Sequence, residues 1–94
     1  MQYIHNESIL IMKNISKEGL AITYRLFENV KESQTSYSVL VSLCCENGCE
    51  EDYYIPELSE SRMAALVLFE KLCENAVLPC EVEEIYSDGF SEIL

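Results

Sequence analysis

Two runs of alternating apolar residues constrain the fold of this chain more than any other feature of its sequence. The apolar members of the first run (20–27) and of the second (37–43) are Leu20, Ile22, Tyr24, Leu26, Tyr37, Val39, Val41 and Leu43. A repeat of two residues is the period of a β-strand that buries one of its faces. The sequence therefore predicts two half-buried strands, separated by a polar, turn-like segment at 29–36.

A third strand and a long helix follow these two runs. Residues 46–48 (Glu-Asn-Gly) form a tight-turn signal, because Asn and Gly tolerate positive φ at little cost. Residues 50–55 can then return as the third strand of an antiparallel meander, which Pro56 is expected to end. Ser59 is a suitable N-cap for a helix over 60–76, a stretch without Gly or Pro.

The predicted helix carries one apolar stripe. Its members recur at helical spacing: Ala65, Leu66, Phe69, Leu72, Cys73 and Ala76. We expect this stripe to cover the sheet, with Phe69 as its central buried side chain. Val67 and Leu68 lie off the stripe, which leaves one or both of them exposed or in an interface.

The two ends of the chain give weaker signals. After Pro79, apolar residues at helical spacing predict a short helix over about 81–87, closed by Gly89, with a strand as the alternative. Residues 1–18 read as an arm with a short extended piece at Ile9–Met12. The predicted fold class is therefore α+β: a three-stranded antiparallel meander covered by one long helix, plus a short C-terminal helix and an N-terminal arm or extra strand. We expect a single domain over 1–94, with the arm at 1–18 and the core at 19–90.

The charge balance argues against several classes of partner. Seventeen Asp and Glu face six Lys and Arg, which gives a formal net charge of -11. Nucleic acids and anionic membranes should repel such a chain, whereas a basic protein would be attracted to it. Residues 2–12 lack the basic segment and the apolar run of a signal peptide, so we expect a cytoplasmic protein.

Cysteines form the most conspicuous local pattern. Cys44, Cys45 and Cys49 could bind zinc, but adjacent residues of a strand point to opposite faces, so at most two thiolates converge. Cys73 could join them only if the helix lies over that strand, and the single histidine, His5, is in the arm. An odd total of five cysteines without a secretory context indicates reduced thiols. We therefore predict no metal site, no cofactor and no functional disulfide.

The acidic clusters and the search for catalytic motifs give little evidence of a functional site. Glu50–Asp52 and the group Glu81, Glu83 and Glu84 lack the spacing of a calcium-binding loop and are expected to be solvated. One histidine without a nucleophilic partner, and no Gly-rich phosphate loop, argue against an enzyme. We predict a non-enzymatic protein-interaction or regulatory module. The alternatives are a cysteine-based metal or redox sensor and an acidic mimic of nucleic acid.

Four segments carry the order of these elements: Tyr24-Arg25-Leu26, the strand from Tyr37 to Leu43, Tyr54-Ile55-Pro56-Glu57-Leu58-Ser59, and the ending from Leu78 to Phe90 with its Pro-x-x-apolar-x-acid-apolar spacing. In these segments, over residues 20 to 90, the chain resembles a family of short Gram-positive bacterial proteins known only as a domain of unknown function. The resemblance implies a compact bacterial cytosolic fold and supplies no catalytic residue. The chain departs from the family in the long arm before Gly19.

The arm bears on the oligomeric state. Its apolar residues, Ile4 and Ile9–Met12, need cover, because each large apolar side chain left in water forgoes about 1.5–3 kcal/mol of burial. An extended segment can find that cover on an edge strand of its own chain or of a neighbouring chain. We expect a homodimer in which the arm takes part, with pairing inside one chain as the alternative.

Overall fold

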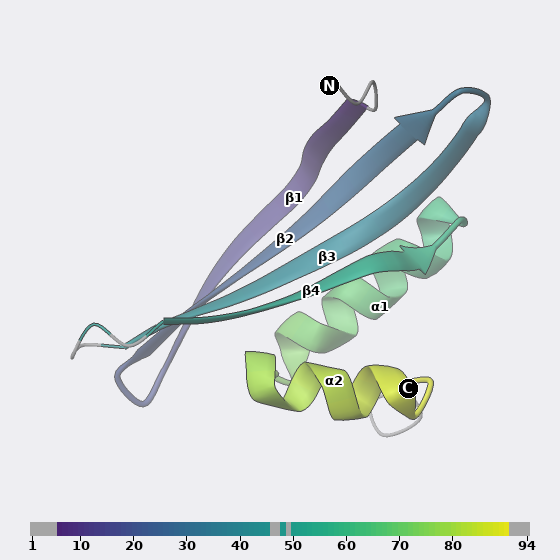
Figure 1. Cartoon of the computed structure of the whole chain (residues 1–94). Helices are drawn as coiled ribbons and strands as arrows, with labels where there is room; N and C mark the ends of the chain where they lie inside the picture. Colours follow the sequence, from purple (N-terminus) through teal and green to yellow (C-terminus); the bar gives the residue numbers. More distant parts are fainter. Residues whose placement is uncertain (1–5, 46–47, 49, 91–94) are drawn as a thin grey trace.

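The structure, a computed structural model, describes residues 6–45, 48 and 50–90. Four strands, β1 (Asn6–Lys17), β2 (Leu20–Lys31), β3 (Gln34–Cys45) and β4 (Glu50–Ser59), are followed by two helices, α1 (Arg62–Glu74) and α2 (Pro79–Ser87). The strands form one antiparallel sheet in the order β1-β2-β3-β4, with both helices on the same side (Figure 1). The predicted α+β class is confirmed, and the meander has four strands.

The fourth strand is the predicted arm, and it pairs with β2 of its own chain. Ile11 lies opposite Leu26, and Ile15 lies opposite Ile22. A β-bulge between Ile9 and Ile11 explains why this strand lacks a clear alternation in the sequence. One extra residue shifts the side-chain alternation, so Ile9 and Ile11 lie on opposite faces although they are two residues apart.

The predicted turn at 29–36 is wrong in its extent. β2 continues to Lys31 and β3 begins at Gln34, so only Glu32 and Ser33 form the turn. The polar residues on either side of it pair in the ladder, as Asn29 does with Ser36. Backbone hydrogen bonds continue the hairpin beyond the residues that contact the buried core. The polarity of the side chains does not indicate this continuation, because backbone pairing does not depend on it.

Pro56 does not end the last strand, contrary to the prediction. β4 continues to Ser59, with a register shift in which Val39 lies opposite Ile55 while Tyr37 lies opposite Ser59. Because β4 is an edge strand, one side of its backbone has no ladder partner, and a residue without an N–H is tolerated there.

Helix α1 begins two residues later than predicted, because Ser61 is its N-cap. The hydroxyl of Ser61 accepts a hydrogen bond from the backbone N–H of Ala64 at 3.3 Å. The predicted cap, Ser59, instead accepts a hydrogen bond from the Ser61 N–H at 3.0 Å. Ser59 therefore stabilises the turn that leads into the helix.

The hydrophobic core lies between the sheet and the apolar stripe of α1. Of the predicted stripe, Ala65, Phe69, Leu72 and Cys73 are buried and Leu66 is partly buried. Ala76 is not part of the helix, which ends at Glu74 and not at 76 as predicted, and Val67 is 45 % exposed. The opposing sheet residues are the predicted alternating ones: Ile22, Tyr24, Leu26, Tyr37, Val39, Val41 and Leu43, all buried.

Helix α2 packs against β3 and β4 at one end of the sheet (Figure 1). It begins at Pro79, where proline's missing N–H costs nothing, and the Glu81 carboxylate accepts a hydrogen bond from the Leu78 N–H at 2.9 Å. Residues Pro79–Ser87 form a helix, which begins two residues earlier than predicted, so the strand alternative for this segment is wrong. Val82 and Ile85 are its buried residues besides Pro79. Within the described ranges, neither helix is long and apolar enough to cross a membrane.

Candidate functional site: the uncovered face of the sheet

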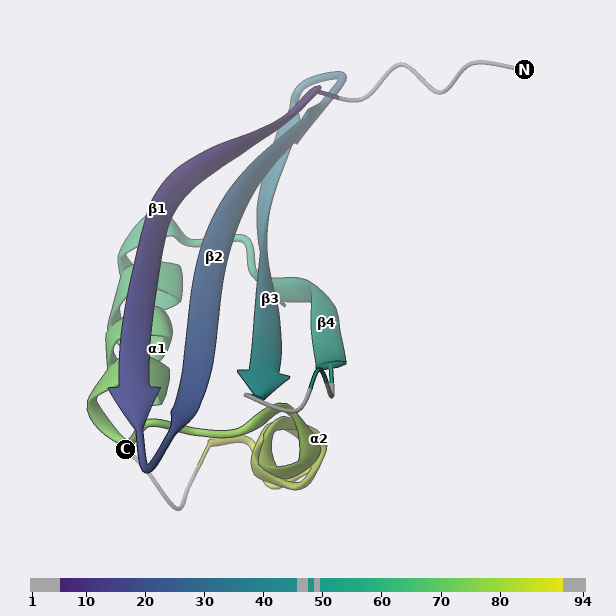
Figure 2. The ribbon, with the colours of Figure 1, turned by 90° about the vertical axis from the view of Figure 1, so that its left-hand side faces the viewer.

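The face of the sheet opposite the helices is not covered by any described element (Figure 2). Residues that lie opposite each other on neighbouring strands share a face, so the register defines what this face displays. One row across all four strands consists of Met12, Arg25, Leu40 and Tyr54. The adjoining row contains Ile9 and Phe27.

The apolar members of these rows, Ile9, Met12, Phe27, Leu40 and Tyr54, form what we call the apolar patch. Ile9 is 54 % exposed, Met12 52 % and Tyr54 45 %, while Phe27 and Leu40 are half-buried. Isolated exposed apolar residues are common on protein surfaces, whereas a large contiguous group of them is typical of interaction sites.

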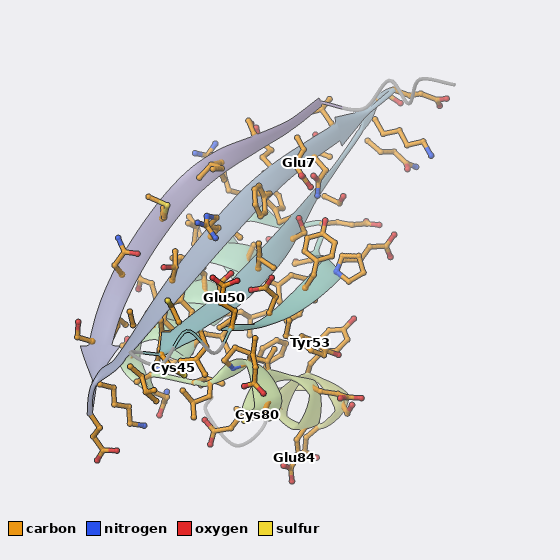
Figure 3. The ribbon with its side chains drawn as sticks, turned by 60° about the vertical axis from the view of Figure 1, so that its left-hand side comes forward. Glu7, Cys45, Glu50, Tyr53, Cys80 and Glu84 are labelled. Atoms are coloured by element: carbon orange, nitrogen blue, oxygen red, sulfur yellow. The ribbon has the colours of Figure 1, made fainter. Side chains whose placement is uncertain are left out.

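Tyr54 also links the two outer strands across this face. Its hydroxyl donates a hydrogen bond to Oε2 of Glu7 at 3.2 Å, although 47 residues separate the two in the sequence. Glu7 is on β1 and Tyr54 on β4, and Figure 3 shows where Glu7 lies on the sheet. This contact orients the Tyr54 ring at the border of the apolar patch.

The other half of the uncovered face is polar. A hollow of about 270 Å³ is lined by Ala21, Thr23, Arg25, Ser42, Leu43, Cys44, Glu50 and Asp52. Within it, Nη1 of Arg25 donates a weak hydrogen bond to the Ser42 hydroxyl at 3.4 Å. The guanidinium thus lies between the apolar patch and the carboxylates of Glu50 and Asp52.

Charges on the uncovered face nearly balance, unlike those of the whole chain. The register places Arg25 and Lys31 on this face together with Glu7, Glu50 and Asp52. The chain as a whole carries a formal charge of -11. Most of the acidic residues therefore lie elsewhere, and this face repels other acidic surfaces less than the rest of the molecule does.

Two acidic groups that are far apart in the sequence meet at one end of the molecule. Glu51 and Asp52 of β4 and Glu83 of α2 border one hollow of about 240 Å³, and Glu83 also borders a neighbouring hollow with Glu84. Figure 3 shows Glu50 on the sheet and Glu84 on the outer side of α2. In the part of the chain that the structure describes, no three His, Cys, Asp or Glu side chains are grouped to hold a metal ion.

The structure does not bring the predicted cysteine pattern together. Cys44 is exposed on the uncovered face, whereas Cys45 is partly buried against the core on the opposite side. Cys73 is buried in α1 and Cys80 is exposed on α2. Cys49 and His5 lie outside the described residues.

The sequence does not predict the apolar patch. Alternation identifies the buried side chains of the strands, and the bulge obscures the pattern of β1.

Burial perturbs the titration of two core groups close to α1, Cys73 and Tyr24. Burial raises the pKa of the Cys73 thiol from 9.0 to about 11, against the opposing effect of the Lys13 ammonium. Burial also raises the pKa of the Tyr24 phenol, and its hydroxyl donates a 2.8 Å hydrogen bond to the carbonyl of Val77. Both groups are therefore neutral parts of the core. A thiol must ionise to act as a nucleophile, so Cys73 has a structural role.

These shifts predict a loss of stability in alkaline solution. The Cys73 thiol ionises at a lower pH in the unfolded chain than in the folded one. Its neutral form therefore contributes fully to the unfolding free energy below pH 9, and this contribution is lost as the pH rises from 9 to 11. Cys73→Ala should reduce the slope of unfolding free energy against pH in this window by up to about 1.4 kcal/mol per pH unit. Urea denaturation of both proteins at pH 8, 9 and 10 measures that slope. Parallel curves for the two proteins would contradict the assignment.

Comparison with known proteins finds no family model, no curated protein and no solved structure that matches this chain. The resemblance to the Gram-positive family therefore stays a prediction.

Proposed function

We propose that this chain is a non-enzymatic protein-interaction module that binds a protein partner through the uncovered face of its sheet. The single observation that supports this proposal most strongly is the apolar patch. Ile9, Met12 and Tyr54 are each about half exposed and adjoin two further apolar side chains on the same face. Covering them would release water from a contiguous apolar surface, at roughly 25 cal/mol per Å² buried.

A second exposed apolar group is smaller and less suitable. Met63 and Val67 are 77 % and 45 % exposed and lie one turn apart on the outer side of α1. They form a pair on one helix, whereas the apolar patch extends over four strands and includes aromatic side chains. Aromatic residues contribute a large share of the binding energy in typical interfaces.

The polar half of the face indicates the chemistry of the partner. The Arg25 guanidinium would donate hydrogen bonds to a carboxylate of the partner, and the carboxylates of Glu50 and Asp52 would accept hydrogen bonds from a basic group beyond it. The partner's surface should therefore have an apolar centre that covers the apolar patch. Beside that centre, one acidic and one basic residue should face the polar hollow around Arg25.

We also propose that the protein acts in the cytoplasm and as a homodimer. A domain of 94 residues has a small core, and self-association would add to its stability.

The acidic-mimic alternative has less support than the sheet face. It requires the carboxylates to gather on one surface, and those of β4 and α2 do meet at one end. Others lie far from that end, as Glu7 of β1 does in Figure 3. The sensor alternative is supported still less, because Cys44 and Cys45 face opposite sides of the sheet.

Substitution of Tyr54 tests the proposed binding face. We expect Tyr54→Ser to weaken capture of the partner from native cell extract at least tenfold, because an aromatic anchor is typically worth more than 1–2 kcal/mol. Met63→Ser is the matched control, since it removes a more exposed apolar side chain from α1 and should leave capture unchanged. Quantitative mass spectrometry of the captured proteins gives the ratio. A set of proteins retained equally by all three baits would contradict the proposal.

A further inference from the structure

The sheet has two edges, and they differ in how well they are protected. An edge strand presents unpaired backbone N–H and C=O groups, so proteins usually block it with charge, proline, bulges or a covering element. In this meander the edges are β1 and β4.

The β4 edge is blocked in several of these ways. Glu50, Glu51 and Asp52 are consecutive exposed carboxylates, and Pro56 removes a donor farther along. The register shift opposite Tyr37 interrupts the strand, and α2 packs beside it. A second strand, above all one of another acidic chain, would be repelled from this edge.

The β1 edge is long and open. It extends over 12 residues, and in Figure 2 no described element lies in front of it, while α1 lies behind it. The helices pack mainly against the other three strands. Apolar side chains line both of its faces, with Met12 half exposed on one side and Ile11 and Ile15 only partly buried on the other.

Charge also distinguishes β1 from the rest of the molecule. This strand carries Lys13 and Lys17 against a single carboxylate, Glu7, whereas the chain carries -11. Two copies of such an acidic chain repel each other least where their surfaces are least acidic. We propose that β1 pairs antiparallel with β1 of a second copy, across a two-fold axis, to form one continuous eight-stranded sheet.

The bulge and the lysines define the register of this pair. The bulge at Leu10 makes the strand irregular, so pairing uses the regular stretch Ile11–Lys17. Centring the axis on Lys13 would place two ammonium groups opposite each other, and centring it on Ile15 would set Lys13 against Lys17. With Asn14 opposite itself, Lys13 of each copy faces Ile15 of the other, and no like charges are directly opposed.

This dimer would extend the binding surface beyond one chain. A two-fold axis perpendicular to the sheet keeps both uncovered faces on the same side. The two apolar patches would then lie on one continuous surface, with Met12 of each copy close to the axis. The edge pairing itself does not depend on the proposed partner, because it concerns the purified chain alone.

Asn14→Asp is the sharpest test of the pairing. Asn14 is exposed, and its Oδ1 accepts a hydrogen bond from the Thr23 hydroxyl at 2.8 Å, which a carboxylate can also accept. The substitution keeps the fold and places two like charges face to face at the axis, which should raise the dimer dissociation constant about tenfold. Gln34→Glu, at the exposed hairpin between β2 and β3, adds the same charge away from β1 and is the matched control.

Sedimentation equilibrium at tens of micromolar protein, at low and at moderate salt, measures the dissociation constants. We expect a dimer that strengthens with salt, is weakened by Asn14→Asp and is unchanged by Gln34→Glu. Hydrogen exchange at low and high protein concentration should show extra protection confined to the β1 amides. A monomer at both salts, equal dimerisation of the two variants, or protection in another element instead would each overturn the proposal. A wild-type chain that stays monomeric but still captures its partner would overturn the pairing alone, and the Tyr54 experiment tests the binding face separately.

Discussion

Phe69→Ala should destabilise the folded chain by about 3–5 kcal/mol. The side chain is completely buried at the centre of the stripe by which α1 covers the sheet. Truncation removes the burial of an aromatic ring and leaves a cavity that the surrounding strands cannot fill. A domain of this size has a total stability of about 5–14 kcal/mol, so the loss is a large part of it. Equilibrium urea denaturation gives the difference in unfolding free energy.

Val67→Ala provides the control on the same helix. Val67 lies two residues before Phe69 and is 45 % exposed, so its truncation should change stability by no more than about 0.5 kcal/mol. A loss below about 1 kcal/mol for Phe69→Ala, or equal losses for both variants, would show that the buried face of α1 is wrongly assigned.

Removing β1 should have a comparably large effect. A chain that begins at Lys17 loses the cover that Leu10, Ile11 and Ile15 give to the core. Half burial of three such side chains is worth roughly 3 kcal/mol, and the buried residues Ile22 and Leu26 would then line a new edge. We expect this chain to be at least about 3 kcal/mol less stable, or unfolded, by circular dichroism and urea denaturation.

Point substitutions separate this packing effect from dimerisation. In the Asn14→Asp background, Ile15→Ala should cost about 1–2 kcal/mol, because the half-buried Ile15 contacts the core. Ser16→Ala, on the exposed side of the same strand, should be within about 0.5 kcal/mol of its parent. A truncated chain as stable as the full chain would show that the folded core does not need β1.

The candidate site could be predicted only in part from the sequence. Alternation predicted which residues of β2 and β3 face the helices, and hence by elimination which face away. It did not show that Met12 and Tyr54 lie in one row, since these are on the two outer strands and the register of both strands contains an irregularity. The meeting of Glu51 with Glu83 likewise depends on how α2 packs beside β4.

The sequence by itself determined the local elements whose side-chain period is regular. The alternating runs in β2 and β3 and the stripe around Phe69 specify a strand or a helix together with its buried face, because burial selects for that period within a few residues. The N-cap, by contrast, was misplaced by two residues, since Ser59 and Ser61 have similar capping propensity and the geometry of the turn decides between them.

Tertiary structure decided how many strands the sheet has, how far they extend and which of them lie at its edges. β1 has little periodicity of its own, and its pairing with β2 supplies the backbone hydrogen bonds that make it a strand despite the bulge at Leu10. Pro56 is accommodated because β4 lies at the edge, a position that only the assembled sheet defines. Long-range pairing depends on which strands become neighbours, and a local sequence pattern does not contain that information.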